Sequence, residues 1–381
     1  MSKKFLFILV FLLTTTFQIS ADIVKRSDQG FLEIVDGQQI MHLKGSPYDL
    51  GFQHGSLLKE QIVRNINELL ESKMSSAKVQ PLLQNFMAAL PQVIPHIPES
   101  LIQEMKGLSD ATNLPYEKIL LLNLFPEMFH CSAITASGKA TANGQLFHVR
   151  VLDYAVGASL QETAVLAIVE PNDGYAFLNV TYAGFIGSVT GMNAQKIALG
   201  EIGGKGYGSW NGLPMAFLLR EILEQAASID DIQRMLSSTP RTCEYYYIFS
   251  DGKTKQAVGA YATAERLAYI SPGSSYSYPF CSQSNGDQNT TTHQQPENCI
   301  VLTRWSHFDI LKERLSKSYG NMTVEDLQNA IKQPVAHPSN LHNAIFAPES
   351  LEVWISHAGP NNEPASDQPY HHFCLLELLG K

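Results

Sequence analysis

The chain has 381 residues, of which 44% are hydrophobic and 17% are charged, and its formal net charge is −9. This length is sufficient for a large buried core. The negative charge and the lack of any long run of like charge argue against nucleic-acid binding, because phosphate contacts require a basic surface.

The first residues have the pattern of a secretory signal peptide. Lys3 and Lys4 precede the apolar run 5–13, and a polar stretch then leads to Ala21. The apolar run is too short to cross a bilayer comfortably. We therefore expect residues 1–21 to be removed on export to the periplasm or the medium. The remaining chain is expected to have no stable membrane span.

The chain contains five cysteines, which is an odd number. In an exported protein this count leaves at least one thiol without an intrachain disulfide partner. Cys281 and Cys299 flank the polar stretch 282–298, where a disulfide would close a loop. Cys243 and Cys374 lie beside apolar runs, as buried thiols do. The count is compatible with a single reactive cysteine at position 131.

Residues 22–130 are predicted to form a mostly helical segment that begins with a hairpin. Two apolar runs, 31–35 and 40–43, flank the turn pair Asp36-Gly37. Ser46 is then a good N-cap, with Pro47 at the first helical position of a helix reaching about residue 73. Shorter helices are expected over 99–108 and 116–125. Gly51 and Gly55, four residues apart, would allow another backbone to approach this first long helix.

From Cys131 onward the pattern changes to strands interrupted by two helix pairs. We expect sheets that are covered by helices on both outer faces, in one catalytic domain spanning residues 131–381. The predicted strands are 131–136, 146–152, 163–170, 175–181, 195–200, 245–250, 255–262, 266–270, 343–347, 351–357 and 373–378. The predicted helices are about 214–227, 229–237, 303–317 and 323–332, and residues 273–298 are expected to form an exposed loop.

The start of this strand-rich part is predicted to be a β-hairpin that brings a cysteine close to charged residues. Pairing Cys131 opposite Arg150 places the turn between Gly138 and Gly144, with Asp153 three residues further on. A fixed cation lowers the pKa of a neighbouring thiol. If Cys131 is also a chain terminus, its α-amine can accept the thiol proton, and Asp153 can position that amine or the arginine. From spacing alone, a small buried cysteine and a surface ion pair are the competing interpretation.

The stretch His130 to Tyr154 resembles the processing site of the acyl-coenzyme A:6-aminopenicillanic acid acyltransferase-like family. This family consists of autoproteolytic cysteine members of the N-terminal-nucleophile hydrolases, and bile-salt hydrolases and acid ceramidases are similar relatives. The resemblance implies an α+β fold with a four-layer αββα core, self-cleavage before the cysteine and attack on an acyl carbonyl. Further resemblance lies at 51–55, 191–193, 200–201, 240–242, 250–252 and 339–343.

The resemblance implies roles for individual residues. Cys131 matches the nucleophile, Arg150 and Asp153 match its supporting pair, and the bond between His130 and Cys131 is the expected cleavage site. His130 stands where a glycine is often found. Relatives commonly supply an oxyanion donor from an Asn in the strand matching residues 244–247, which here contains none. The donor is then expected to be Asn340, Asn343 or a tyrosine.

Three further residues are predicted to bind substrate. Glu201 follows a glycine at a strand end, and acid ceramidase-like relatives use a glutamate in this region, although a solvated turn carboxylate fits equally well. His342 lies at a strand entrance, where it would line the pocket. Tyr245 begins an aromatic run that also fits a half-buried strand. The histidines have no metal-ligand spacing, so we expect neither a metal nor an organic cofactor.

Together these patterns predict an exported, self-processing cysteine amidohydrolase. A prosegment of residues 22–130 is expected to stay bound to the catalytic chain after cleavage, and the partner is a small N-acyl substrate. Because coenzyme A thioesters belong to the cytoplasm, export favours hydrolysis over acyl transfer. The alternatives are an acyltransferase, a phospholipase B-like lipid esterase and an uncleaved, non-catalytic binding protein.

Overall fold

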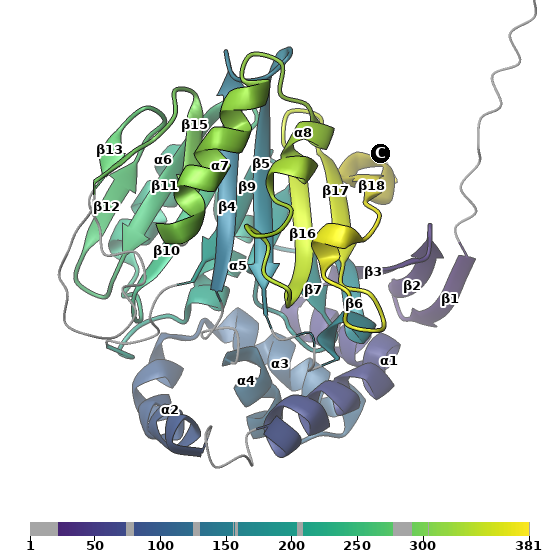
Figure 1. Ribbon diagram of the computed structural model, residues 1–381. Coiled ribbons are helices and arrows are strands. Elements are labelled where there is room, and N and C mark those ends of the chain that lie inside the picture. The colour runs from purple at the N-terminus through teal and green to yellow at the C-terminus, as the bar shows by residue number, and fades with distance from the viewer. Residues whose placement is uncertain are drawn as a thin grey trace, which may run out of the picture.

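Two β-sheets packed face to face form the centre of the molecule (Figure 1). The computed structural model describes residues 22–73, 80–124, 130–154, 156, 159–203, 209–276, 292–303 and 305–380. The predicted signal peptide and Cys281 lie outside these residues. Cys299, its suggested disulfide partner, is a buried free thiol, Cys243 is buried and Cys374 is half-buried.

The predicted N-terminal hairpin is confirmed. Strands β2 (Gly30–Val35) and β3 (Gln38–Gly45) are joined by the turn Asp36-Gly37. Both turn residues have positive φ, 51° and 76°, as a tight two-residue hairpin requires. An additional strand, β1 (Asp22–Ser27), pairs with β2 at the sheet edge. The segment therefore contains three strands ahead of its helices.

The first long helix begins where the sequence predicted. Helix α1 (Pro47–Asn65) is capped by Ser46, whose hydroxyl accepts from the Asp49 amide while the Asp49 carboxylate accepts from the Ser46 amide. This reciprocal pair satisfies backbone donors that the helix itself cannot. A π-helical stretch, Ile66–Lys73, continues it. The other helices of the N-terminal segment are α2 (Gln80–Val93), α3 (Glu99–Thr112) and α4 (Tyr116–Leu124).

Helices α1 and α3 approach each other closely through glycines. A Cβ atom at Gly51 would lie only 1.8 Å from the carbonyl oxygen of Glu104, and one at Gly107 would lie 2.1 Å from that of Tyr48. Only glycine leaves room for such backbone contact. The expectation that Gly51 and Gly55 allow another backbone to approach is confirmed, since Gly55 likewise packs against Leu108.

The ten-stranded sheet joins the N-terminal segment to the rest of the chain. Its order is β1-β2-β3-β6-β7-β8-β9-β10-β11-β12, and β3 runs parallel to β6. The strands after the hairpin are β6 (Ala164–Pro171), β7 (Phe177–Tyr182), β8 (Thr190–Asn193), β9 (Ile197–Ile202), β10 (Tyr245–Asp251), β11 (Gln256–Ala262) and β12 (Leu267–Ile270). The boundary at residue 130 therefore divides the sequence but not the sheet.

The six-stranded sheet contains the candidate nucleophile. Its order is β15-β4-β5-β16-β17-β18. The strands are β4 (His130–Gly138), β5 (Gly144–Asp153), β15 (Cys299–Leu302), β16 (Asn340–Ala347), β17 (Glu352–His357) and β18 (His371–Cys374). Because β4 and β5 are central in this sheet, side chains on their inner face lie between the two sheets.

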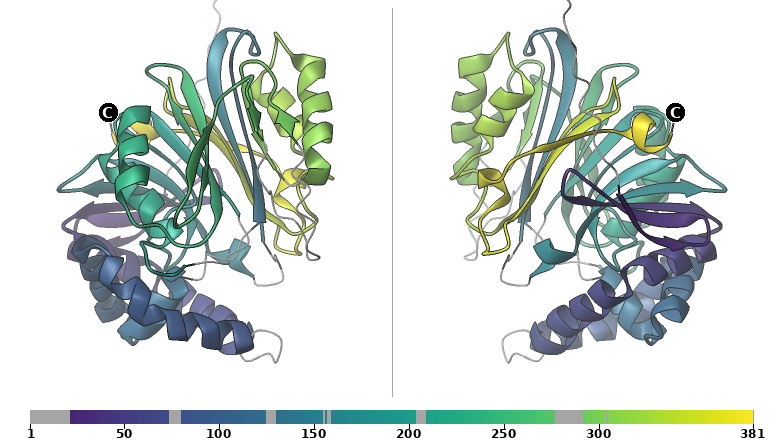
Figure 2. Two further views of the ribbon diagram at one scale, coloured as in Figure 1. Left: turned by 90° about the vertical axis from the view of Figure 1, so that its left-hand side faces the viewer. Right: turned by 90° about the vertical axis from the view of Figure 1, so that its right-hand side faces the viewer.

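Helices cover both outer faces, so the predicted four-layer αββα arrangement is confirmed (Figure 2). Helices α5 (Met215–Gln225) and α6 (Ile229–Ser238) pack on the ten-stranded sheet, and α7 (Trp305–Ser318) and α8 (Val324–Ala330) pack on the six-stranded sheet. The helices α1 to α4 lie across one end of this sandwich (Figure 1). No helix in the described ranges has the length and hydropathy needed to cross a bilayer.

Two predictions near the C-terminus were wrong in detail. The predicted strand 373–378 is the short strand β18 followed by the helical turn α9 (Leu375–Leu378), because leucine and glutamate favour a helix over a strand. The predicted loop 273–298 contains a small pair of strands, β13 (Ser275–Tyr276) and β14 (His293–Gln294).

The contact between α1 and α3 gives a test of the fold. Replacing Gly51 by Ala inserts a methyl group into the Glu104 backbone, so we expect the free energy of unfolding to fall by about 3 kcal/mol. Denaturant unfolding measures this change. Glu60→Ala, on the exposed side of the same helix, is the control and should change stability by less than about 0.5 kcal/mol. Equal stability of the two variants would contradict the close packing.

Candidate active site

The hairpin formed by β4 and β5 has a different register from the predicted one. Cys131 pairs with Leu152, and Arg150 pairs with Ala133, so the prediction that Cys131 lies opposite Arg150 was wrong by two residues. The register shift next to Gly138 accounts for part of the difference. A shift of two residues leaves every side chain on its original face of the sheet. Cys131 and Arg150 therefore still face the same side.

Cys131, Arg150 and Glu201 meet in the interior between the sheets. The Arg150 Nη2 atom lies 2.8 Å from Cys131 Sγ and 3.2 Å from Glu201 Oε2. The Cys131 thiol in turn donates to Glu201 Oε2 at 3.7 Å. The side chains of Arg150 and Glu201 are 0% and 1% exposed. A thiol, a guanidinium and a carboxylate thus form one buried cluster.

The position of Arg150 is fixed by backbone groups. Its Nε atom donates to the Val189 carbonyl oxygen at 3.3 Å, and its Nη1 atom donates to the Val151 carbonyl oxygen. The Val189 oxygen also accepts from the Glu201 amide at 3.1 Å. A Cβ atom at Gly200 would lie 2.8 Å from Arg150 Cδ, so the guanidinium stem passes directly over a glycine. Sequence reasoning missed Val189, because a carbonyl contact leaves no residue-type signal.

The thiol of Cys131 is not acidified, contrary to the sequence-based expectation. The pKa of Cys131 is raised to about 12, mainly by burial. The Glu201 carboxylate acts in the same direction as burial, and Arg150 acts in the opposite direction. Desolvation of the thiolate outweighs the neighbouring cation. The thiol of the continuous chain is therefore protonated at neutral pH, and any nucleophilic step requires a base to remove its proton.

Asp153 lies at the end of β5, opposite His130 across the hairpin. Its Oδ1 atom accepts from the His337 amide at 3.1 Å. The carboxylate also acts to raise the pKa of the Cys131 thiol. Asp153 is thus next to the backbone of the predicted cleavage site. The side chain of His130 lies outside the part of the chain that the structure describes.

Asn340 and Asn343 form a buried pair in β16. The Asn343 Nδ2 atom donates to Asn340 Oδ1 at 2.9 Å, and the Asn340 Nδ2 atom donates to the Leu152 carbonyl oxygen at 3.0 Å. Asn343 pairs with Val151, which pairs with Ser132, the neighbour of Cys131. Alternation along the strands places Asn343 on the opposite face from Cys131. The geometry therefore gives the predicted oxyanion role of Asn343 no support, whereas Asn340 contacts the carbonyl oxygen of Leu152, the strand partner of Cys131.

His342 lies on the inner face of the sheet and connects the two sheets. Its Nδ1 atom is 2.7 Å from the Tyr182 hydroxyl, and its Nε2 atom is 2.9 Å from Thr190 Oγ1. Burial holds the pKa of His342 well below its usual value, and the charge of Arg150 contributes in the same direction. The histidine is thus neutral and lies in the electrostatic field of the site. Tyr245 is buried against Tyr247, which pairs with Glu201 across β9 and β10.

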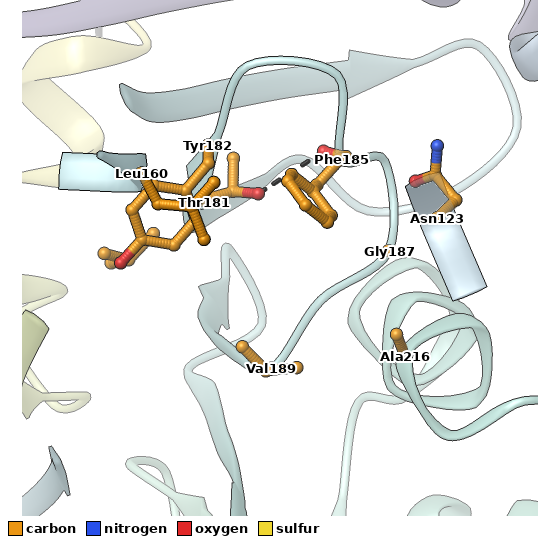
Figure 3. A pocket seen from close by; sticks show the side chains of 9 residues that line it. Asn123, Leu160, Thr181, Tyr182, Phe185, Gly187, Val189 and Ala216 are labelled. Carbon is orange, nitrogen blue, oxygen red and sulfur yellow. Dashed lines mark hydrogen bonds between the residues drawn. The ribbon is translucent and has the colours of Figure 1, made fainter. Parts of the chain in front are cut away.

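A small pocket lies beside this network (Figure 3). Its volume is about 20 Å³, which is sufficient for roughly one water molecule. The sequence did not predict this pocket. The only available signal was the glycine-containing turn after β7, since glycine often marks a close approach of the backbone to another element. Its lining residues come from helix α4, the helical turn Leu160–Thr163, strand β7, the turn between β7 and β8, and helix α5: Asn123, Leu160, Val180, Thr181, Tyr182, Phe185, Gly187, Val189 and Ala216.

Within the described residues, no three His, Cys, Asp or Glu side chains are grouped closely enough to bind a metal ion. A protonated thiol lies between a carboxylate that can accept its proton and a guanidinium that can stabilise negative charge.

The charge of Glu201 gives a test of this cluster. In Glu201→Gln the negative charge that raises the thiol pKa is removed, so we expect the pKa of Cys131 to fall. The rate of Cys131 alkylation by iodoacetamide should then rise at fixed pH, and its pH profile should move to lower pH. Mass spectrometry of the Cys131 peptide measures this rate. Glu33→Gln, in β2, is the control, and an unchanged or higher thiol pKa in Glu201→Gln would contradict the cluster.

Several proteins are similar to this chain over long stretches. Protein dcd1B of Dictyostelium discoideum is 27% identical over 358 residues, which cover 84% of this chain and 68% of that protein. Acid ceramidase of Rattus norvegicus is 26% identical over 244 residues, covering 56% of this chain and 59% of that enzyme. The N-acylethanolamine-hydrolyzing acid amidase of Oryctolagus cuniculus is 30% identical over 173 residues, covering 42% of this chain and 47% of that enzyme.

The family model described as acyl-coenzyme A:6-aminopenicillanic acid acyl-transferase matches residues 140–362. The match begins after Cys131 and includes Arg150, Asp153 and Glu201. It spans more than half of the chain, including β5, most of both sheets and the helices on their outer faces. The chain therefore belongs to the acyl-coenzyme A:6-aminopenicillanic acid acyl-transferase family.

Proposed function

We propose that this protein is a self-processing cysteine hydrolase that cleaves the C–N amide bond of an N-acyl compound through an acyl-enzyme on Cys131. The observation that carries the proposal is the buried contact of Cys131 with both Arg150 and Glu201. A thiol between a cation and a proton acceptor is a common arrangement for nucleophilic attack on a carbonyl. Relatives named as acid ceramidase and as an N-acylethanolamine-hydrolyzing amidase support an amide substrate.

The first reaction is cleavage of the chain itself. Cys131 Sγ attacks the carbonyl carbon of His130 while Glu201 accepts the thiol proton, and the peptide nitrogen of Cys131 leaves with a proton. The resulting thioester is hydrolysed by water, which releases a carboxylate on His130 and the thiol and α-amine of Cys131. Glu201 is the base in this step because the continuous chain has no α-amine at residue 131.

The second reaction uses the new terminus. The α-amine of Cys131 accepts the thiol proton, and the thiolate attacks the substrate amide carbon. The substrate amine leaves with that proton, and water then hydrolyses the thioester to release the carboxylic acid. Arg150 stabilises the thiolate, and Asp153, opposite His130, positions the new amine. Acyl transfer would need an amine in place of this water.

Two further properties belong to this proposal. The protein is exported, supported by the basic and apolar pattern of residues 3–21. The cleaved N-terminal segment stays bound, supported by the parallel pairing of β3 with β6 and by the buried ion pair between Glu104 and Arg220, at 2.8 Å. Separation of the two chains would expose both the sheet edge and these charges.

Cleavage is tested by sequencing the purified protein. We expect two fragments on a denaturing gel, the larger beginning Cys-Ser-Ala, and one intact chain in Cys131→Ala. Size-exclusion chromatography should elute the two wild-type fragments together. Cys374→Ala, which removes a half-buried thiol on β18, is the control and should cleave like the wild type. A single intact chain in wild type and Cys131→Ala alike would refute self-processing.

The substrate class is tested with a panel of N-acyl amides and phospholipid vesicles. We expect release of the carboxylic acid from N-acyl amides by the cleaved protein and a loss of at least about a thousandfold in Cys131→Ala, since the nucleophile is removed. Lipid-ester release from phospholipid without amide cleavage would instead identify a phospholipase B-like esterase. Formation of a new amide with an added amine, in place of the acid, would identify an acyltransferase.

A further inference from the structure

We infer that the turn 183–189, between β7 and β8, is fixed in its working geometry by side chains of the N-terminal segment. This makes His54, Asn65 and Asn123 positioning residues for the chemistry of Cys131. The inference rests on the proposed function, and it assigns the N-terminal segment a part in catalysis beyond remaining bound.

The first half of this turn has its backbone groups satisfied by the N-terminal segment. The Ala183 oxygen accepts from Asn65 Nδ2 at 2.8 Å, and the Gly184 amide donates to His54 Nε2 at 2.9 Å. Asn123 makes two contacts: its Nδ2 atom donates to the Gly184 oxygen at 2.9 Å, and its Oδ1 atom accepts from the Ile186 amide at 2.7 Å. Three side chains from α1 and α4 thus bind four backbone groups in succession.

These contacts restrict the turn to one backbone conformation. His54, Asn65 and Asn123 are at most 2% exposed, so water cannot readily replace a lost partner. Gly184 has φ of +93°, and a Cβ atom there would lie 2.7 Å from Leu122 Cδ2. The backbone of the turn is therefore in direct contact with α4. Because His54 Nε2 accepts a hydrogen bond, the imidazole is neutral, and burial lowers the pKa of His54 to about 3.

A second connection reaches the same turn through helix α5. The Ile186 oxygen accepts from Arg220 Nη1 at 2.7 Å, and Arg220 Nη2 is paired with Glu104 of α3 at 2.8 Å. The guanidinium also lies 4.7 Å above the Phe177 ring. A buried cation of this kind requires carboxylate partners. Arg220 has two, Glu104 from the N-terminal segment and Glu224 from its own helix at 2.7 Å.

The other end of the turn contacts the reacting groups. The Val189 oxygen accepts from both Arg150 Nε and the Glu201 amide. Arg150 in turn contacts Cys131 Sγ at 2.8 Å. Only four residues lie between Gly184 and Val189, so a displacement of the first half of the turn changes where the Val189 carbonyl directs the arginine. The N-terminal segment thereby acts on the thiol through a short backbone connection.

The test compares isosteric replacements that remove these contacts. Asn123→Leu and His54→Leu lose the bonds to the turn, whereas His54→Gln keeps an acceptor near the position of Nε2. Gln53→Ala is the matched control, because Gln53 is equally buried on α1 but bonds only to the backbone of Lys44. For each variant we measure the rate of self-cleavage, co-elution of the fragments, kcat and KM for an N-acyl amide, and the rate of Cys131 alkylation.

We expect Asn123→Leu and His54→Leu to cleave slowly but completely, to retain both fragments, and to lose about tenfold to a hundredfold in kcat with KM little changed. His54→Gln should recover most of this loss, and Gln53→Ala should match the wild type. Wild-type kcat in both leucine variants, or an equal loss in Gln53→Ala, would overturn the inference. If the wild type hydrolyses no N-acyl amide, the proposed function fails. The inference is then decided by the Cys131 alkylation rate: a changed rate in both leucine variants supports it, and wild-type rates in both overturn it.

Discussion

The burial of one arginine charge determines much of this structure. Arg150 is 0% exposed, and a buried guanidinium is stable only when a negative group and hydrogen-bond acceptors surround it. Glu201 from β9, the Val189 carbonyl before β8 and the Val151 carbonyl of β5 meet this need. The two sheets must therefore approach closely at this point, which Gly200 allows. The thiol of Cys131 is placed against the arginine as a consequence of this arrangement.

The same burial means that the proposed chemistry requires proton transfer from Cys131 rather than an acidic thiol. In a solvated site, a cation next to cysteine would lower the thiol pKa. Here the loss of solvation is the larger effect and raises the pKa of Cys131 to about 12. The neighbouring carboxylate of Glu201 thus has two opposing effects. It stabilises the protonated thiol, and it supplies the acceptor through which that proton could leave.

Local patterns in the sequence predicted most of the secondary structure, and long-range packing accounts for what they missed. The Asp36-Gly37 turn and the Ser46 cap depend on residues near in sequence, and both are confirmed. The close approach at Gly51 is also confirmed, although its partner Glu104 could not be identified from the local pattern. The pairing of Cys131 with Leu152 was missed because a turn of unknown geometry sets the register. The contacts of Val189 and the positions of Asn340 and Asn343 depend on neighbouring strands that no local pattern identifies. Arg150 was found because its proximity to Cys131 survives a shift of two residues.

The parallel pairing of β3 with β6 has a consequence for how the protein can be made. A polypeptide that starts at residue 131 would begin folding without β1, β2 and β3, and its ten-stranded sheet would end at an open β6. Exposed strand edges of this kind recruit other chains and promote aggregation. The N-terminal segment, present in the same chain, thus covers the β6 edge that would otherwise be open.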